Sequence, residues 1–114
     1  LPEDQQLACL GAAVDEVNQE AAGARPAAQA WADGRLGEVK AHWATAALDR
    51  CLLPNARVQA LLEKGTADAT REVDAALRTP GRTVALVDLH FLMRSDGLLD
   101  RLKAEGAEIS SPST

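Results

Sequence analysis

The sequence predicts an α+β fold that is predominantly helical, with three or four helices packed around a small β element. Apolar residues recur at steps of three and four over long stretches, which predicts the helices. One short apolar run, rich in β-branched residues and placed between a Pro-Gly turn and a loop, predicts the β element. A chain of 114 residues has room for one domain. We expect this domain to cover residues 1–111, with residues 112–114 as a tail.

The first predicted helix begins near Pro2 and ends at Gly23, before the Arg25-Pro26 step. Its apolar residues form one stripe of the kind that faces a core, with the polar residues between them solvated. The stripe consists of Leu7, Leu10, Val14, Val17 and Ala21.

Residues 26–53 are expected to be helical but interrupted. Gly34 and Gly37 mark a break, and a second helical piece runs from about Leu36 to Leu53. Trp31 and Trp43, the two largest apolar side chains, should anchor the core between the helices.

Residues 56–78 are best interpreted as one long helix that keeps its phase across Gly65. A break at Gly65-Thr66, with Thr66 as the N-cap of a second helix, is the alternative. Pro80-Gly81 ends the helix in either case.

The predicted β element consists of strands at about 83–89 and 107–110, which flank a short helix. The buried face of that helix should carry Leu98, Leu99 and Leu102. The two strands could pair in parallel, but a sheet of two strands is poorly protected. Either helices cover both of its faces, or a missing segment or a second chain completes it; we favour the second option.

The charge of the chain argues against several partners. Its 17 acidic residues outnumber its 12 basic ones, whereas a duplex-binding domain gathers basic residues to neutralise phosphates.

No apolar run is long enough to span a bilayer, so we expect no membrane insertion. Because the chain begins with Leu1 rather than Met, we expect a processed product or an excised piece of a longer chain.

The chain has two cysteines, Cys9 and Cys51, which are too few and too far apart for a metal-knuckle pattern. In an exported chain they could pair and join two helices. In the cytosol they would be small buried apolar residues, and we favour two packed thiols.

His90 is the most suggestive candidate for chemistry, because it lies at the C-terminal end of the predicted strand, where ligands bind in open α/β sheets. Asp88 would share its face of a regular strand, so the pair could form a metal ligand with its orienting carboxylate, or a general base. Hydrogen bonding of His90 to a loop is the simpler interpretation, and we favour it. His42 lies four residues after Glu38 on a predicted helix, which indicates a surface pair rather than a metal site.

The C-terminal part of the chain resembles TraB/GumN-type proteins. In that family an apolar strand runs into a Gly-x-x-His motif, and a Gly-Leu-Leu helix start and a final glycine follow. The resemblance here is carried by residues 80–90, which read Pro-Gly-Arg-Thr-Val-Ala-Leu-Val-Asp-Leu-His, then by Asp96-Gly97-Leu98-Leu99, Leu102 and Gly106. Weaker likeness upstream extends over nearly the whole chain, which would correspond to the C-terminal half of a full family member.

The resemblance implies an α/β fold related to Tiki-type metal-dependent proteases and to ChaN-like haem-binding proteins. His90 matches the second of two histidine motifs, but the glycine of that motif is replaced by Val87. An Arg-Asn pair of the protease branch would fall near Gly65-Thr66, and neither residue matches. The first histidine motif belongs to sequence that this chain does not contain. The resemblance also favours a periplasmic or extracytoplasmic location.

From this we expect a non-catalytic scaffold or binding module that associates with itself, which would cover unmatched apolar surface. The alternative is the C-terminal half of a metal-dependent hydrolase, with His90 as one metal ligand, Asp88 behind it and the other ligands in a missing N-terminal half. A helical interaction domain without a ligand is a third interpretation. No cofactor is expected other than a divalent metal at His90.

Overall fold

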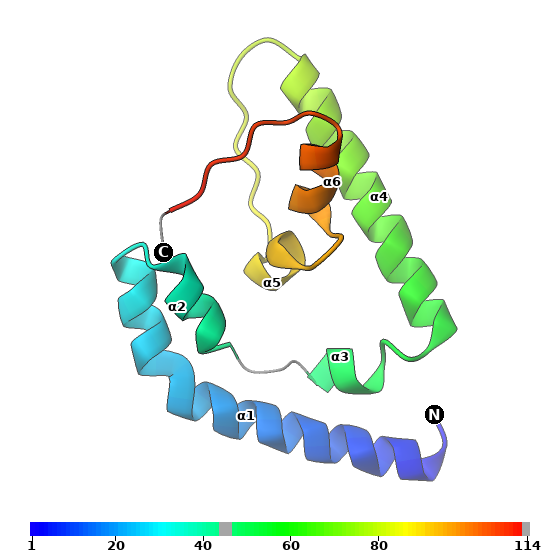
Figure 1. The fold of residues 1–114 in the computed structure, drawn as a ribbon. Helices are drawn as coiled ribbons and strands as arrows, with labels where there is room; N and C mark the ends of the chain where they lie inside the picture. Colours follow the sequence, from blue (N-terminus) through cyan, green and yellow to red (C-terminus); the bar gives the residue numbers. More distant parts are fainter. Residues whose placement is uncertain (44–46, 113–114) are drawn as a thin grey trace. The chain divides into compact units, whose positions relative to one another are not determined.

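The computed structural model describes residues 1–43 and 47–112. In that part of the chain there are six α-helices: α1 (Glu3–Ala32), α2 (Leu36–Ala41), α3 (Ala47–Cys51), α4 (Ala56–Arg78), α5 (Leu89–Met93) and α6 (Leu98–Ala104) (Figure 1). The described residues divide into two compact units, residues 1–59 with 111–112 and residues 60–110.

The predicted end of the first helix at Gly23 is wrong, because α1 continues through Pro26 to Ala32. A proline inside a helix removes one backbone hydrogen bond and bends the axis, and α1 is visibly bent in Figure 1. Gly23 has a different role, because it lies where α1 meets the end of α2. A Cβ atom at this position would be 2.8 Å from the carbonyl oxygen of His42.

The face of α1 that packs against α2 and α3 is built from small residues and one carboxylate. It includes Cys9, Ala12, Glu16, Gly23 and Ala30. The predicted apolar stripe lies on another face, and its four largest side chains are exposed: Leu7 63%, Leu10 63%, Val14 53% and Val17 64%. The expectation that this stripe faces a core is therefore wrong. Small side chains allow short helices to approach α1 closely, and this approach decides which face is covered.

The helix predicted from Leu36 to Leu53 is replaced by the two short helices α2 and α3. Its middle part, residues 44–46, lies outside the described residues. Trp31 was expected to anchor the core, but its side chain is 62% exposed, so that prediction is wrong. Trp43 is half-buried.

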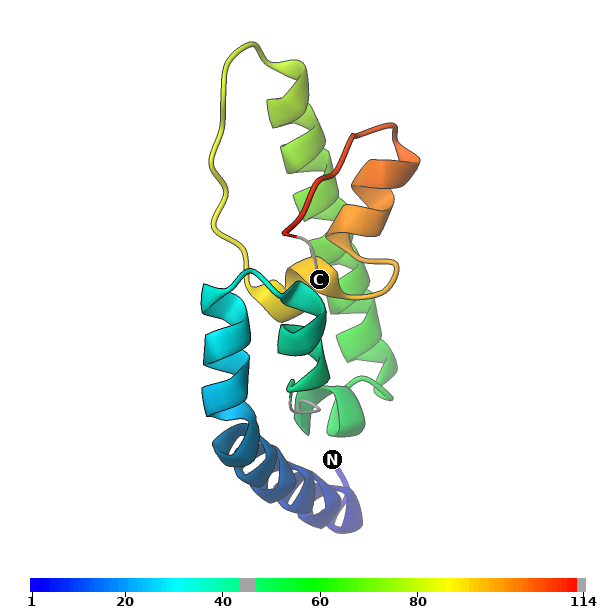
Figure 2. The ribbon, with the colours of Figure 1, turned by 60° about the vertical axis from the view of Figure 1, so that its left-hand side comes forward.

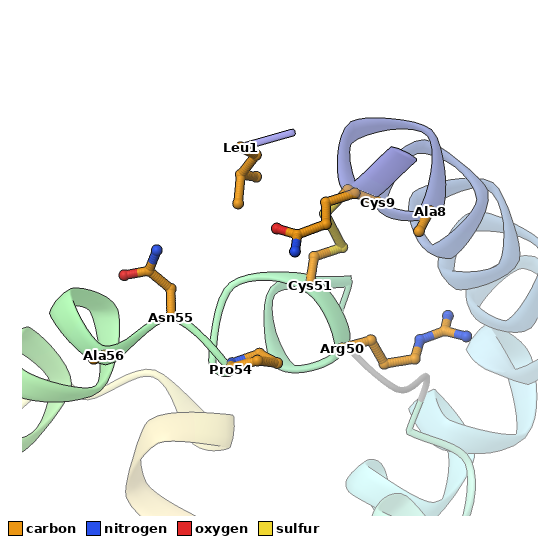
Figure 3. A pocket seen from close by; sticks show the side chains of 9 residues that line it. Leu1, Ala8, Cys9, Arg50, Cys51, Pro54, Asn55 and Ala56 are labelled. Atoms are coloured by element: carbon orange, nitrogen blue, oxygen red, sulfur yellow. A yellow bond between two sulfur atoms is a disulfide. The ribbon is translucent and has the colours of Figure 1, made fainter. Parts of the chain in front are cut away.

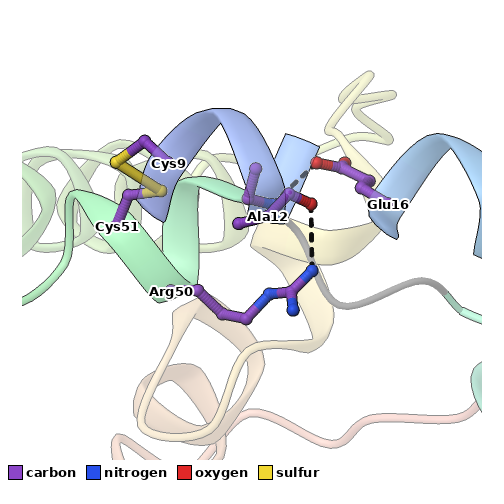
Figure 4. Close-up of a disulfide and its surroundings, with 6 residues drawn as sticks. Cys9, Ala12, Glu16, Arg50 and Cys51 are labelled. Carbon is purple, nitrogen blue, oxygen red and sulfur yellow. Dashed lines mark hydrogen bonds between the residues drawn. A yellow bond between two sulfur atoms is a disulfide. The ribbon is translucent and has the colours of Figure 1, made fainter. Parts of the chain in front are cut away.

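Helix α3 is attached to α1 by polar contacts (Figure 4). The backbone N–H of Ala47 donates to Glu16 Oε2 at 2.7 Å. The guanidinium of Arg50 donates to the carbonyl oxygen of Ala12 at 3.0 Å and lies 3.5 Å from the carboxylate of Asp15.

A disulfide between Cys9 and Cys51 joins the same two helices (Figure 4). Their Cα atoms are 5.2 Å apart, which is within the usual range for such a bond. Our expectation of two packed thiols is corrected by this pairing. The bond closes a sequence separation of 42 residues, so it restrains a large part of the first unit.

Helix α4 is continuous across Gly65, which confirms the prediction of one long helix. Asn55 caps its start, because its side-chain oxygen accepts from the backbone N–H of Arg57 at 2.9 Å. Thr66 does not cap a second helix. Its hydroxyl donates to the carbonyl oxygen of Leu62 at 2.8 Å, which satisfies a buried polar group within the helix.

In the second unit α6 lies beside α4, as both views show (Figures 1 and 2). Leu98 and Leu102 are buried and Leu99 is half-buried, in agreement with the predicted face of this helix. The guanidinium of Arg101 donates to both carboxylate oxygens of Glu63, at 2.9 and 2.7 Å. These hydrogen bonds lower the pKa of Glu63, so the pair remains charged and links α6 to α4 at neutral pH.

The predicted β element is wrong: over residues 1–43 and 47–112 there is no strand. Residues 82–88 have no regular secondary structure, and the backbone enters α5 at Leu89. Residues 107–110 are also irregular. The apolar run has strand-like composition, but a strand needs a neighbour to satisfy its backbone, and two strands alone form a marginal sheet. The fold of the described residues is therefore helical.

The close approach at Gly23 can be tested with a matched pair of substitutions on α1. Gly23→Ala should lower the free energy of unfolding by about 1–2 kcal/mol, because the new methyl group meets a backbone oxygen that cannot rotate away. Gly11→Ala should raise it by about 0.5–1 kcal/mol, because nothing lies within 4 Å of an added Cβ and alanine favours the helix. Urea unfolding followed by circular dichroism measures both. Equal effects of the two substitutions would contradict this role of Gly23.

Loss of the disulfide should destabilise the chain strongly. For a loop of this length the chain-entropy model gives about 4 kcal/mol. Cys9→Ser/Cys51→Ser and the reduced wild type should both unfold at lower urea concentration than the oxidised wild type, with α3 released from α1. The double variant should not respond to reductant. An unchanged midpoint in the reduced wild type would contradict a structural role for this bond.

Candidate functional site

Asp88 and His90 lie at the start of α5 rather than on a strand. Asp88 is the N-cap residue: its Oδ1 accepts from the backbone N–H of Phe91 at 3.0 Å, and its carbonyl oxygen accepts from Leu92 at 2.9 Å. His90 is an exposed residue in the first turn of this helix. Asp88 and His90 therefore do not share one face as they would on a strand, because a step of two positions turns a helix by about 200°.

The described residues do not bring three metal-ligating side chains together at His90. Among residues 1–43 and 47–112, no group of three or more His, Cys, Asp or Glu side chains could hold a metal ion. A catalytic metal centre usually needs three protein ligands. His90 and Asp88 alone thus do not fit such an ion, and further ligands would have to come from outside the described residues.

His42 and Glu38 also remain separate in function. The carboxylate of Glu38 forms an ion pair with Arg35, which raises the pKa of that guanidinium. Arg35 binds Asp33 as well, at 2.8 Å, and this hydrogen bond, followed by one from Gln29, lowers the pKa of the Asp33 carboxyl. The acidic groups at the end of α1 and in α2 are therefore used in a surface network around Arg35.

An open pocket of about 590 Å³ lies beside the disulfide in the first unit (Figure 3). It is lined by the N-terminal residue, by α1 and α3, and by the segment that leads from α3 into the first residue of α4: Leu1, Gln5, Ala8, Cys9, Arg50, Cys51, Pro54, Asn55 and Ala56. Two polar groups of this lining hold the fold, because Arg50 binds the backbone of α1 and Asn55 caps α4. The reactive feature of the pocket is the disulfide itself, which a thiol could reach from this side.

Two structurally important interactions were not predicted from the sequence. The first is the N-cap of α4 at Asn55, although an asparagine immediately before a helix is a typical N-cap signal. The bond between Arg101 and Glu63 joins positions that are 38 residues apart, so no local pattern could predict it.

None of the helices formed by the described residues combines the length and hydrophobicity needed to span a bilayer. No curated protein and no solved structure matches the chain. A family model does match, that of the TraB/PrgY/gumN family, and the match covers residues 1–111. With nearly its whole length covered, the chain belongs to the TraB/PrgY/gumN family.

Proposed function

We propose that residues 1–111 act as one non-catalytic scaffold or binding module that associates with a second copy of itself. The observation that supports this proposal is the amount of apolar surface left outside. The buried apolar residues among those described are few and mostly small: Ala12, Ala30, Val39, Leu98 and Leu102. Large exposed apolar surfaces commonly mark sites where another molecule binds.

The segment before α5 is one such surface. Val84 is 97% exposed and Leu86 102% exposed, and both belong to a stretch without regular secondary structure. Exposing two large apolar side chains completely is unfavourable in water, and covering them on association recovers the hydrophobic free energy. The stripe on α1 is a second surface of this kind, in the other unit.

The disulfide supports an oxidising compartment for this module, such as the periplasm or the outside of the cell. Structural disulfides persist in such compartments and are rare where thiols are kept reduced. Here the bond carries part of the stability that a larger core would otherwise supply.

Self-association should be visible in the purified chain. Sedimentation velocity over a wide range of protein concentration should show a dimer that dissociates on dilution, with little change when salt is raised, because apolar burial is not screened. A monomer at every concentration would contradict the self-association part of the proposal.

The second candidate function is the C-terminal half of a metal-dependent hydrolase, with His90 as one ligand and Asp88 behind it. The exposed position of His90 favours this candidate, because ligands from another chain could reach it. Its remaining ligands, and the partner that carries them, would lie in an N-terminal half.

Zinc titration by calorimetry separates the two candidates. For a scaffold, wild type, His90→Ala and the matched control His42→Ala should bind zinc equally weakly, since one histidine does not hold the ion. Stoichiometric binding that His90→Ala abolishes and His42→Ala retains would instead support the hydrolase candidate.

A further inference from the structure

Helix α1 has two differently built faces. Its small residues contact α2 and α3, whereas Leu7, Leu10, Val14 and Val17 are each more than half exposed. These four residues are separated by steps of three, four and three. The same alternation continues to the end of the helix, at Ala21, Ala24, Ala28 and finally Trp31, all exposed.

This spacing is a heptad repeat with apolar residues at every a and d position from Leu7 to Trp31. A seam of this kind packs against a second helix by inserting side chains of one helix between those of the other. We call the eight positions the α1 seam. Because the disulfide and the contacts of Arg50 hold α3 on another face of the same helix, the seam is left available to a partner.

The charged residues beside the seam indicate which partner fits. Glu20 occupies a g position and Arg25 the e position of the next heptad, and both are exposed. In a parallel two-stranded pair, a g residue lies beside the e residue that is five positions further along the other helix. Two identical chains would therefore form two symmetric Glu20–Arg25 pairs.

The other g and e positions do not oppose this arrangement. Gln6 would lie beside Gly11 of the other copy, and Ala13 beside Asn18, so no like charges meet. An antiparallel pair places g beside g and e beside e, and does not bring Glu20 and Arg25 together in this way.

We infer that a second copy of this chain binds along the α1 seam, parallel to the first and aligned by the two Glu20–Arg25 pairs. This inference rests on the self-association proposed above and names the surface and the orientation that produce it.

The full chain tests the seam by sedimentation equilibrium. Leu10→Glu/Val17→Glu should weaken the dimer about 30-fold or more, because it places charges at the centre of the interface. Leu61→Glu, at an exposed leucine on α4, is the control and should leave the dimer unchanged. At a protein concentration low enough for all three proteins to be monomeric, circular dichroism and the urea midpoint should be the same, since these side chains are exposed within one chain and dimer formation no longer adds stability.

Charge exchange tests the orientation without altering the apolar residues. Glu20→Arg and Arg25→Glu should each weaken the dimer, because like charges would meet twice, and the double exchange should restore it. Absence of this rescue would overturn the parallel alignment.

Three further outcomes overturn the inference in different ways. If the wild type is a monomer at every concentration, the proposed self-association is contradicted as well. A dimer that survives Leu10→Glu/Val17→Glu leaves self-association intact but places it elsewhere. Unfolding of this variant, with the Leu61→Glu control folded, means that another part of the same chain covers the seam.

Discussion

The covalent bond between Cys9 and Cys51 is the constraint on which the first unit depends. Helix α3 has five residues, too few to be stable alone in water. The buried apolar side chains described in this unit are Ala12, Ala30 and Val39, which bury little area. The disulfide holds α3 on α1, and the contacts of Arg50 and Glu16 with the facing helix become available only in that arrangement. It also forms one wall of the adjacent pocket.

Helix α1 has two differently built faces: one contacts α2 and α3, and the other carries exposed apolar residues. The side that meets α2 and α3 needs small residues, and Gly23 shows how close that approach is. The large apolar residues are therefore left on the outside, where they can serve association but add nothing to the core of this unit. In the second unit an ion pair links two helices: Arg101 on α6 donates two hydrogen bonds to Glu63 on α4. This distribution of apolar surface is the observation behind the binding role that we propose.

Family membership by itself does not assign a chemical role to His90 and Asp88. The match to the TraB/PrgY/gumN family covers residues 1–111. The position of His90 at a family histidine remains a prediction from the sequence resemblance. Asp88 next to it has a structural task as the N-cap of α5, which alone explains a carboxylate at that position. Catalysis by His90 would require ligands that its own helix and the other described residues do not bring to it.

The sequence by itself determined the features that depend on neighbouring residues: the continuous helix α4, the buried face of α6 with Leu98 and Leu102, and the resemblance to the family. Helical periodicity and family motifs are local, so they can be recognised without a fold. Only the tertiary structure decided where α1 ends, which of its faces is covered, that the cysteines pair, and that residues 83–89 form no strand. Two of these depend on a partner far away in the chain: the covered face of α1 depends on His42, which lies against Gly23, and the pairing of Cys9 depends on Cys51. Hydrophobicity and backbone propensity describe neighbouring residues, so they do not identify partners that only the folded chain brings close.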